Sequence, residues 1–392
     1  MANLSFYLNR IVLCTTLIAC FSFRPSHSED TVSHETAGSS AFFIFGDSTV
    51  DSGNNNYIET SPENRADYEP YGQNGFFERP TGRFSDGRII VDFIAEYANL
   101  PLIPPFLQRS ADHTNGVNFA SGGAGVLPET NQGLVIDLQT QVKNFEEVRK
   151  GLVETVGEER AKEIVEEAVY FISIGSNDYM GGYLGNPKMQ KRFTPEQYVG
   201  MVVGNLTQIV QRLYEKGGRK FGFLSLGPLG CLPALRALST EGGCLEAASA
   251  LALAHNHALS SILSSLQLAL QGFTYSNSNF YDWLHDRIHN PSAYGFKEGE
   301  KACCGSGPYG GIFSCGGTKK TIEYNLCDNV NDHVWWDSFH PTQIIHHQFA
   351  LTFWNGPPSS VAPFNLHHLF TANTKRTIAD VVDQAPQHQF DF

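Results

Sequence analysis

Short apolar segments alternate with amphipathic ones through most of the chain. Four segments are apolar on both sides, are rich in β-branched or aromatic residues, and end in Gly, Ser, Asn or Asp; they are residues 41–45, 117–120, 169–174 and 221–226. Strands without a polar side are typical of a parallel sheet that helices cover on both faces. The pattern therefore predicts an α/β protein with a central parallel sheet.

Helical patterns lie between and after these strands. They are predicted at residues 140–167, at 195–215 behind Thr194 and Pro195, at 245–270, and at 342–354. Pro341 precedes the last of them, and because proline favours the first position of a helix, the pattern places His340 near the N-cap. No Ser/Pro-rich linker interrupts the alternation, so we predict a single domain over residues 29–392.

The first 28 residues have the features of a secretory signal peptide. Arg10 provides a positive charge, residues 11–23 are apolar, and Ser26 and Ser28 are small residues at the −3 and −1 positions of a cleavage site. A retained membrane anchor is the alternative, but a span needs about 20 apolar residues. We expect cleavage near Ser28, secretion to the cell exterior or to the vacuole, and no transmembrane segment afterwards.

Cysteine usage agrees with export. Two of the eight cysteines lie in the leader, and six remain, namely Cys231, Cys244, Cys303, Cys304, Cys315 and Cys327. An even number in an oxidising compartment predicts three disulfides. We favour one local bridge between Cys231 and Cys244 and two bridges within the later group, although other pairings remain open. Zinc is the competing interpretation, but adjacent cysteines lack the spacer that such sites use.

Two further features concern the surface. Asn205 begins the sequon Asn-Leu-Thr and is a candidate glycosylation site. The net charge is −13, and no run of basic residues is longer than the pair Lys319 and Lys320. This composition argues against nucleic acid as a partner.

Polar residues follow the predicted strands at the edge where parallel α/β sheets bind ligands. Ser48 follows the first strand, Gly122 the second, and Asn177 the third. Near the other end of the chain, Asp337 precedes His340 by three residues. Each feature alone is typical of an ordinary turn. Together they provide a nucleophile, a base, a carboxylate and oxyanion donors, which are the groups that acyl transfer by serine requires.

Four ordered blocks resemble the GDSL esterase/lipase family of SGNH hydrolases, in particular its secreted plant branch. They read FGDSTVDSGNN at 45–55, GVNFASGG at 116–123, GSND at 175–178 and DSFHPT at 337–342. Three further stretches also resemble that branch: PTGRFSDGR at 80–88, LGPLGC at 226–231 and ACCG at 302–305.

The resemblance implies a three-layer α/β/α sandwich of the flavodoxin-like kind. It also implies Ser48 as nucleophile, Asp337 and His340 as the rest of the triad, and Gly122 and Asn177 as oxyanion donors beside the N–H of Ser48. Gly123 could align with the family's glycine instead of Gly122. Position 49 is Thr where the family name has Leu.

We therefore predict a secreted serine carboxylester hydrolase without metal or cofactor, acting on a small-molecule or lipid ester through an acyl-enzyme. An acyltransferase that passes the acyl group to an alcohol is one alternative, with Trp335 and Trp336 as candidate lining of an acceptor pocket. A secreted binding protein with vestigial catalytic groups is the other. Labelling of Ser48 by a fluorophosphonate would separate an active site from a vestigial one.

Overall fold

A six-stranded sheet forms the centre of the part of the chain that the structure describes. The structure is a computed structural model and describes residues 40–240, 242–315 and 324–372. The predicted signal peptide lies outside these residues. The sheet has the order β11-β5-β4-β3-β1-β2. Its strands are β1 (Phe42–Gly46), β2 (Gly116–Asn118), β3 (Val169–Ser173), β4 (Lys220–Phe223), β5 (Thr274–Ser278) and β11 (Val361–Pro363).

Five of the six strands run parallel, and only β11 pairs antiparallel, with β5 at the sheet edge. Every residue of β1 and β3 is buried, in agreement with the apolar sequences FFIFG and VYFIS. Phe42 of β1 pairs with Gly116 and Val169, so the register brings the ends of β1, β2 and β3 to one edge. The residues that follow these strands therefore meet there.

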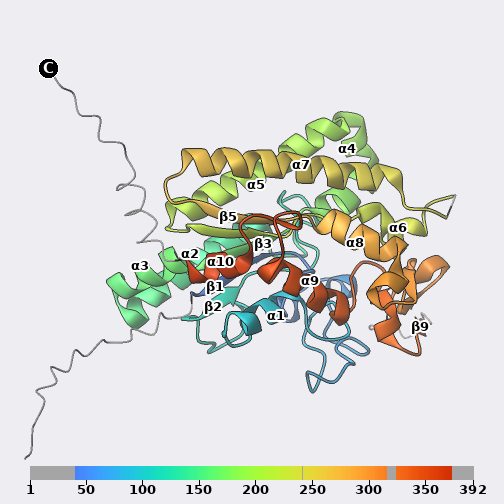
Figure 1. The fold of residues 1–392 in the computed structure, drawn as a ribbon, viewed down its shortest axis with the longest axis horizontal. Coiled ribbons are helices and arrows are strands. Elements are labelled where there is room, and N and C mark those ends of the chain that lie inside the picture. The colour runs from blue at the N-terminus through green and yellow to red at the C-terminus, as the bar shows by residue number, and fades with distance from the viewer. Residues whose placement is uncertain (1–39, 241, 316–323, 373–392) are drawn as a thin grey trace, which may run out of the picture. The chain divides into compact units, whose positions relative to one another are not determined.

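Helices cover both faces of the sheet. The α5 and α7 helices lie side by side on one face, and α1, α9 and α10 pack together on the other (Figure 1). The three-layer α/β/α arrangement is thus confirmed. The helix bounds are α1 (Ile90–Tyr97), α2 (Leu138–Val156), α3 (Glu158–Glu167), α4 (Pro187–Arg192), α5 (Pro195–Glu215), α6 (Pro233–Arg236), α7 (Glu246–Ala269), α8 (Phe280–His289), α9 (Gln343–Asn355) and α10 (Leu366–Thr371).

The helix starts and stops follow local sequence, with two corrections. Thr194 caps α5 as predicted, and its side chain accepts the N–H of Gln197 in a capping box. The helix predicted at 140–167 is two helices, because Gly157 adopts φ +82° between α2 and α3. The last helix starts at Gln343 with Thr342 as N-cap, so His340 does not cap it. Pro341 instead forms a β-bridge with Trp335.

Two small sheets lie beside the main one. One pairs β6 (Glu298–Ala302) with β10 (His333–Trp335), and the other contains β7 (Cys304–Ser306), β8 (Phe313–Ser314) and β9 (Asn325–Leu326). The disulfide Cys231–Cys244 forms as predicted, and Cys303–Cys327 joins two segments of the later group. The third predicted bridge does not form: Cys304 and Cys315 are buried thiols, and Cys315 is hydrogen-bonded to Cys304.

Among the described helices, none combines the length and the apolar character needed to cross a bilayer. Asn205 lies within α5 and is half-buried, and its amide donates to the carbonyl of Met201 at 2.9 Å. Its glycosylation stays a prediction.

Candidate active site

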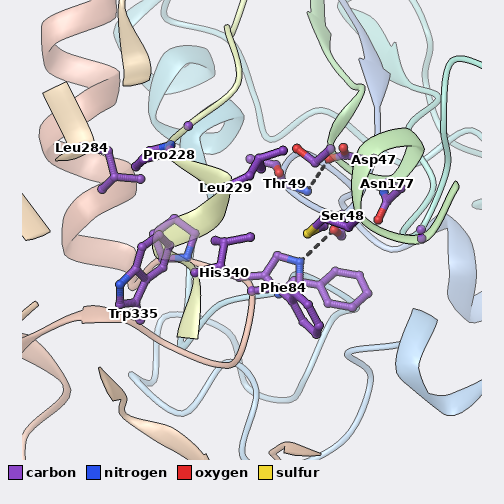
Figure 2. Close-up of a pocket in the computed structure, with 18 of the residues that line it drawn as sticks. Asp47, Ser48, Thr49, Phe84, Asn177, Pro228, Leu229, Leu284, Trp335 and His340 are labelled. Carbon is purple, nitrogen blue, oxygen red and sulfur yellow. Dashed lines mark hydrogen bonds between the residues drawn. The ribbon is translucent and has the colours of Figure 1, made fainter. Parts of the chain in front are cut away.

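Ser48 lies in the turn that follows β1. The backbone N–H of Asp47 donates to the carbonyl of Ser173 at 3.1 Å, which ties this turn to the end of β3. The carboxylate of Asp47 then accepts the N–H of Thr49 at 3.0 Å. Held from both sides, the half-buried Ser48 directs its Oγ to within 2.7 Å of Nε2 of His340 (Figure 2). The two residues are 292 positions apart.

Asp337 holds the other side of the His340 ring. Its Oδ1 lies 2.8 Å from Nδ1 of His340 and also accepts the backbone N–H groups of Phe339 and His340, at 2.9 and 2.8 Å. This short turn, rather than a helix, brings the two side chains together. Burial alone would raise the pKa of the Asp337 carboxyl, but His340 and the hydrogen-bond donors around it hold that pKa below its usual value. Asp337 is therefore ionised at neutral pH.

Tyr71 is a further member of the site that the sequence did not reveal. Its hydroxyl donates to Oδ2 of Asp337 at 2.6 Å, and the residue is buried among Phe84, Trp336 and the cysteines Cys303, Cys304 and Cys315. The ring of Phe84 lies 4.8 Å from the His340 ring. Phe84 belongs to a stretch that resembles the plant branch, but Tyr71 lies in no motif, so only the fold shows its role.

A cavity of about 280 Å³ opens beside Ser48. Figure 2 shows Asp47 and Asn177 around Ser48, with Trp335, Pro228 and Leu284 at the opposite end. The lining at that end is apolar and comes from the loop after β4, from α8 and from β10; it comprises Gly227, Pro228, Leu229, Leu232, Phe280, Leu284 and Trp335. The polar lining includes Glu63, Asn64 and Ser176. The sequence points to Trp335 and Trp336 as candidate lining residues. Trp335 lines the cavity, and Trp336 does not.

The structure favours Gly123 over Gly122 as an oxyanion donor. The N–H of Gly122 donates to Oδ2 of Asp51 at 3.0 Å, and Gly122 does not line the cavity. The oxyanion role of Gly122 stays a prediction, and this contact speaks against it, because the N–H is already bound by a buried carboxylate. Gly123 does line the cavity, and within the described residues the N–H groups of Gly123 and Ser48 have no hydrogen-bond partner.

Asn177 lies in the loop after β3, directly before a short π-helix (Asp178–Leu184), and lines the cavity as predicted. Its amide nitrogen donates to the carbonyl of Ala124 at 2.9 Å. A side-chain amide carries two hydrogens. One hydrogen of Asn177 therefore fixes the amide to the loop after β2, and the second is available to the cavity.

Three buried carboxylates surround this arrangement. Burial raises the pKa of Asp47, Asp51 and Asp178 to about 6 in each case, against the lowering effect of the donors that bind them. Asp51 accepts the N–H groups of Gly53 and Asn54, at 2.7 and 2.8 Å, in addition to that of Gly122. Asp178 accepts the N–H groups of Val126 and Leu127, at 2.8 and 3.0 Å. Asp51 and Asp178 thus hold the two ends of the loop that presents Gly123.

One group of described residues has the spacing of metal ligands. It contains Cys303, Cys327 and His333, but the disulfide between the two cysteines uses both sulfur atoms. It is therefore not a metal site. Ser48 and His340 instead line the cavity, Asp337 lies against the other side of the His340 ring, and Gly123 also lines the cavity, a set that suits acyl transfer.

Comparison with known proteins agrees with this chemistry. The sequence profile of the GDSL-like Lipase/Acylhydrolase family matches residues 42–353. The chain is 48% identical to GDSL esterase/lipase 5 of Arabidopsis thaliana, over 89% of this chain and 92% of the relative. It is 45% identical to a GDSL lipase of Tanacetum cinerariifolium, over 84% of this chain and 87% of the relative. With GDSL esterase/lipase 1 of Arabidopsis thaliana the identity is 46%, over 85% and 91% of the two chains.

Proposed function

We propose that Ser48, His340 and Asp337 carry out the carboxylic ester hydrolysis of this chain, which belongs to the GDSL-like lipase/acylhydrolase family. The observation that carries the proposal is the continuous line of hydrogen bonds from Ser48 Oγ to His340 Nε2 at 2.7 Å and from His340 Nδ1 to Asp337 Oδ1 at 2.8 Å. This line ends at the cavity beside Ser48. We call the apolar end of that cavity, lined by residues such as Leu229, Leu284 and Trp335, its apolar arm. The nucleophile, the base and the group that orients the base are therefore in contact before substrate binds.

In the first half of the reaction Ser48 Oγ attacks the ester carbonyl carbon. A carbon–oxygen bond forms, and the hydroxyl proton passes to Nε2 of His340. The negative charge moves to the former carbonyl oxygen. When the tetrahedral intermediate collapses, the bond to the alcohol oxygen breaks, and His340 returns the proton to the leaving alcohol. The acyl group is then an ester of Ser48.

In the second half water takes the place of the alcohol. His340 accepts a proton from the water as its oxygen attacks the acyl carbon, and the collapse of the second intermediate returns that proton to Ser48 Oγ and releases the acid. Asp337 stays ionised throughout and stabilises the imidazolium, a role supported by its lowered pKa.

The developing oxyanion needs donors that are already in place. The N–H groups of Ser48 and Gly123 and the second hydrogen of the Asn177 amide are our candidates, since each belongs to the cavity and none is fully used elsewhere among the described residues. This set replaces the one expected from the sequence by exchanging Gly122 for Gly123.

The substrate is an ester with an apolar acyl chain. Leu229, Leu284 and Trp335 offer such a chain an apolar wall, with Leu284 and Trp335 at the end of the cavity away from Asn177 (Figure 2). Burial of each methylene stabilises the bound ester by about 0.8 kcal/mol. The polar lining near Glu63 and Asn64 suits the alcohol side of the ester.

Replacement of the nucleophile tests the proposal. We expect Ser48→Ala to lower kcat on short-chain aryl esters by at least about 10³-fold, because it removes the hydroxyl that contacts His340. The melting temperature should be unchanged, because the residue is only half-buried. Fluorophosphonate should label the parent protein and not the variant. Near-normal hydrolysis by Ser48→Ala would remove this site from the mechanism. Addition of several alcohols to the parent would show whether the acyl group passes to water or to an alcohol.

We also propose that the protein is exported. The leader-like sequence at residues 1–28 and the two disulfides support an oxidising compartment. Mass spectrometry of the secreted protein would give the N-terminus directly, and an N-terminus before residue 20 would contradict cleavage near Ser28.

A further inference from the structure

Asn55 is a buried side chain that the proposed mechanism does not yet use. It lies seven residues after Ser48 and is 1% exposed. Its amide nitrogen donates to the carbonyl of Gly122 at 2.8 Å and to the carbonyl of Asn64 at 2.7 Å, and its Oδ1 accepts the hydroxyl of Ser121 at 2.5 Å. Both amide hydrogens and the amide oxygen are thus bound, so the side chain has one orientation.

The contact of Asn55 with the carbonyl of Gly122 also fixes the orientation of the N–H of Gly123. The carbonyl of Gly122 and the N–H of Gly123 belong to the same planar trans peptide group and point in opposite directions. Asn55 holds the carbonyl on one side of this group, and the N–H of Gly123 therefore points away from Asn55. Gly123 lines the cavity, and its N–H has no partner among the described residues.

The neighbouring peptide groups are also fixed by side chains. Asp51 accepts the N–H of Gly122 at 3.0 Å, and Asn131 donates to the carbonyl of Gly123 at 2.8 Å. Gly123 itself adopts φ +84°, a left-handed conformation that glycine adopts readily. Such a peptide can turn over unless its carbonyl is held, because glycine has no side chain to oppose the rotation.

We propose that Asn55 is a positioning residue for ester hydrolysis, which directs the N–H of Gly123 at the oxyanion by holding the carbonyl of Gly122. The inference rests on the proposed function of the Ser48 site. Asn55 does not touch substrate, and its effect on the reaction passes entirely through the Gly122–Gly123 peptide group. The segment that carries the nucleophile thereby also sets one of the donors.

Asn55→Asp is the principal test, because it keeps the shape of the side chain and replaces both N–H donors by an oxygen that repels the carbonyl of Gly122. We expect kcat on aryl esters to fall about 100-fold with KM changed by no more than about twofold, since the donor acts in the transition state. An aryl boronic acid, which forms a tetrahedral adduct with Ser48, should lose a similar factor in affinity. Unchanged kcat in folded Asn55→Asp would overturn the inference.

Asn54→Asp is the matched control. Asn54 is buried in the same turn, and its amide donates to the carbonyls of Asn118 and Ala120, both at 2.8 Å, without touching the Gly122–Gly123 peptide group. It should lose stability to a similar degree as the Asn55 variant while the folded protein keeps a kcat within about threefold of the parent. Equal losses of kcat in the two variants would show that only the fold had been disturbed.

Two further measurements complete the test. Asn55→Ser removes the amide without adding charge, and it should show the same split between kcat and KM; failure of both Asn55 variants to fold would assign the amide to the fold and overturn the inference. Ser48→Ala in the same assay separates the two hypotheses. If Ser48→Ala is inactive and the Asn55 variants have normal kcat, the proposed function stands and the positioning role fails. If Ser48→Ala is active, the proposed function fails first.

Discussion

The hydroxyl of Tyr71 donates to Oδ2 of Asp337, whereas the backbone N–H groups of Phe339 and His340 donate to Oδ1. Asp337 thus has donors on both oxygens, and its plane is fixed against the His340 ring. Hydrogen bonds to charged groups contribute about 1.5–3 kcal/mol when a partner is removed. Asp337 stabilises the imidazolium only while its carboxylate keeps its orientation. Part of the energy of the Tyr71 hydrogen bond therefore lowers the barrier of the reaction.

We therefore expect Tyr71→Phe to lower kcat about tenfold, or ~1.4 kcal/mol, with little change in KM. The phenyl ring keeps the packing of Tyr71 against Trp336 and Phe84. Tyr68→Phe is the control. Tyr68 packs against Tyr71 at 5.4 Å, but within the described part of the chain its hydroxyl donates only to the carbonyl of Pro62, at 3.4 Å. Steady-state kinetics on one ester series suffices, and equal kcat values for the two variants would exclude a role of Tyr71 in orienting Asp337.

At the scale of elements, the loop after β4 and the α8 helix set the length of the apolar arm. Gly227 lines the cavity, and a methyl group at its position would lie 3.3 Å from Phe280 and 3.5 Å from Leu284, which line the same arm. The backbone of Gly227 is not in the left-handed region. An alanine there therefore adds volume to the arm with only a small adjustment of neighbours.

Gly227→Ala should shorten the preferred acyl chain. We expect kcat/KM for the longest p-nitrophenyl esters that the parent accepts to fall about fourfold for each methylene excluded, as a value of about 0.8 kcal/mol per methylene requires. The acetate ester should react as in the parent. Gly204→Ala is the control, since a methyl group at that position in α5 has no described residue within 4 Å apart from its chain neighbours and its own helix backbone. An unchanged chain-length profile would contradict the assignment of the apolar arm to the acyl group.

The same scale shows what the sequence could and could not predict. Strands β1 and β3 are apolar on both sides, so their burial is visible in the pattern. Strand β4 has the sequence KFGF and shows the same pattern only after Lys220. Strand β5 has the sequence TYSNS, and its buried residues include Ser276 and Ser278. It pairs with β4 through the backbone, and its sequence has no hydrophobic periodicity that would predict a strand. The break at Gly157 depends on one positive φ value in a charged stretch that otherwise reads as helix.

The candidate site divides in the same way. Four of the proposed site residues lie in short sequence blocks, and the residue types in those blocks suggest acyl transfer; they are Ser48, Asn177, Asp337 and His340. Tyr71 lies in none of these blocks, and its contact is with Asp337, 266 positions away. Asn55 ends the first block, but its contact with Gly122, 67 positions away, is visible only in the folded chain. Our proposal of Gly123 in place of Gly122 rests on the contact of the Gly122 N–H with Asp51, and adjacent glycines carry no sequence signal for that contact.

At the scale of the molecule, the apolar interior also contains buried ionisable side chains, and one of them is a histidine of α7. His255 of α7 is 1% exposed, and its Nδ1 lies 2.8 Å from the hydroxyl of Tyr179, in the short helix that follows Asn177. Burial lowers the pKa of His255 to about 4 from an ordinary value of 6.5. The folded protein thus keeps this ring neutral at pH values where the unfolded chain protonates it.

The direction of the resulting pH dependence follows from linkage. The unfolded chain binds a proton at His255 below pH 6.5, and the folded protein does so only near pH 4. The contribution of His255 to stability is therefore fully present above pH 6.5 and is lost as the pH falls towards 4. Between pH 7 and pH 5 the loss amounts to ~2 kcal/mol, at about 1.4 kcal/mol per pH unit.

His255→Gln removes this titration and retains an amide that can bond to Tyr179. We measure the free energy of unfolding in urea at pH 7 and at pH 5. We expect its decrease between these pH values to be ~2 kcal/mol smaller in the variant than in the parent. The two proteins can differ in absolute stability, because the prediction concerns only the pH dependence. His257→Gln on the exposed side of α7 is the control and should show the pH dependence of the parent. Parallel pH curves for parent and His255→Gln would mean that His255 is protonated in the folded protein at pH 5, and its burial would then have to be compensated by a charge beside it.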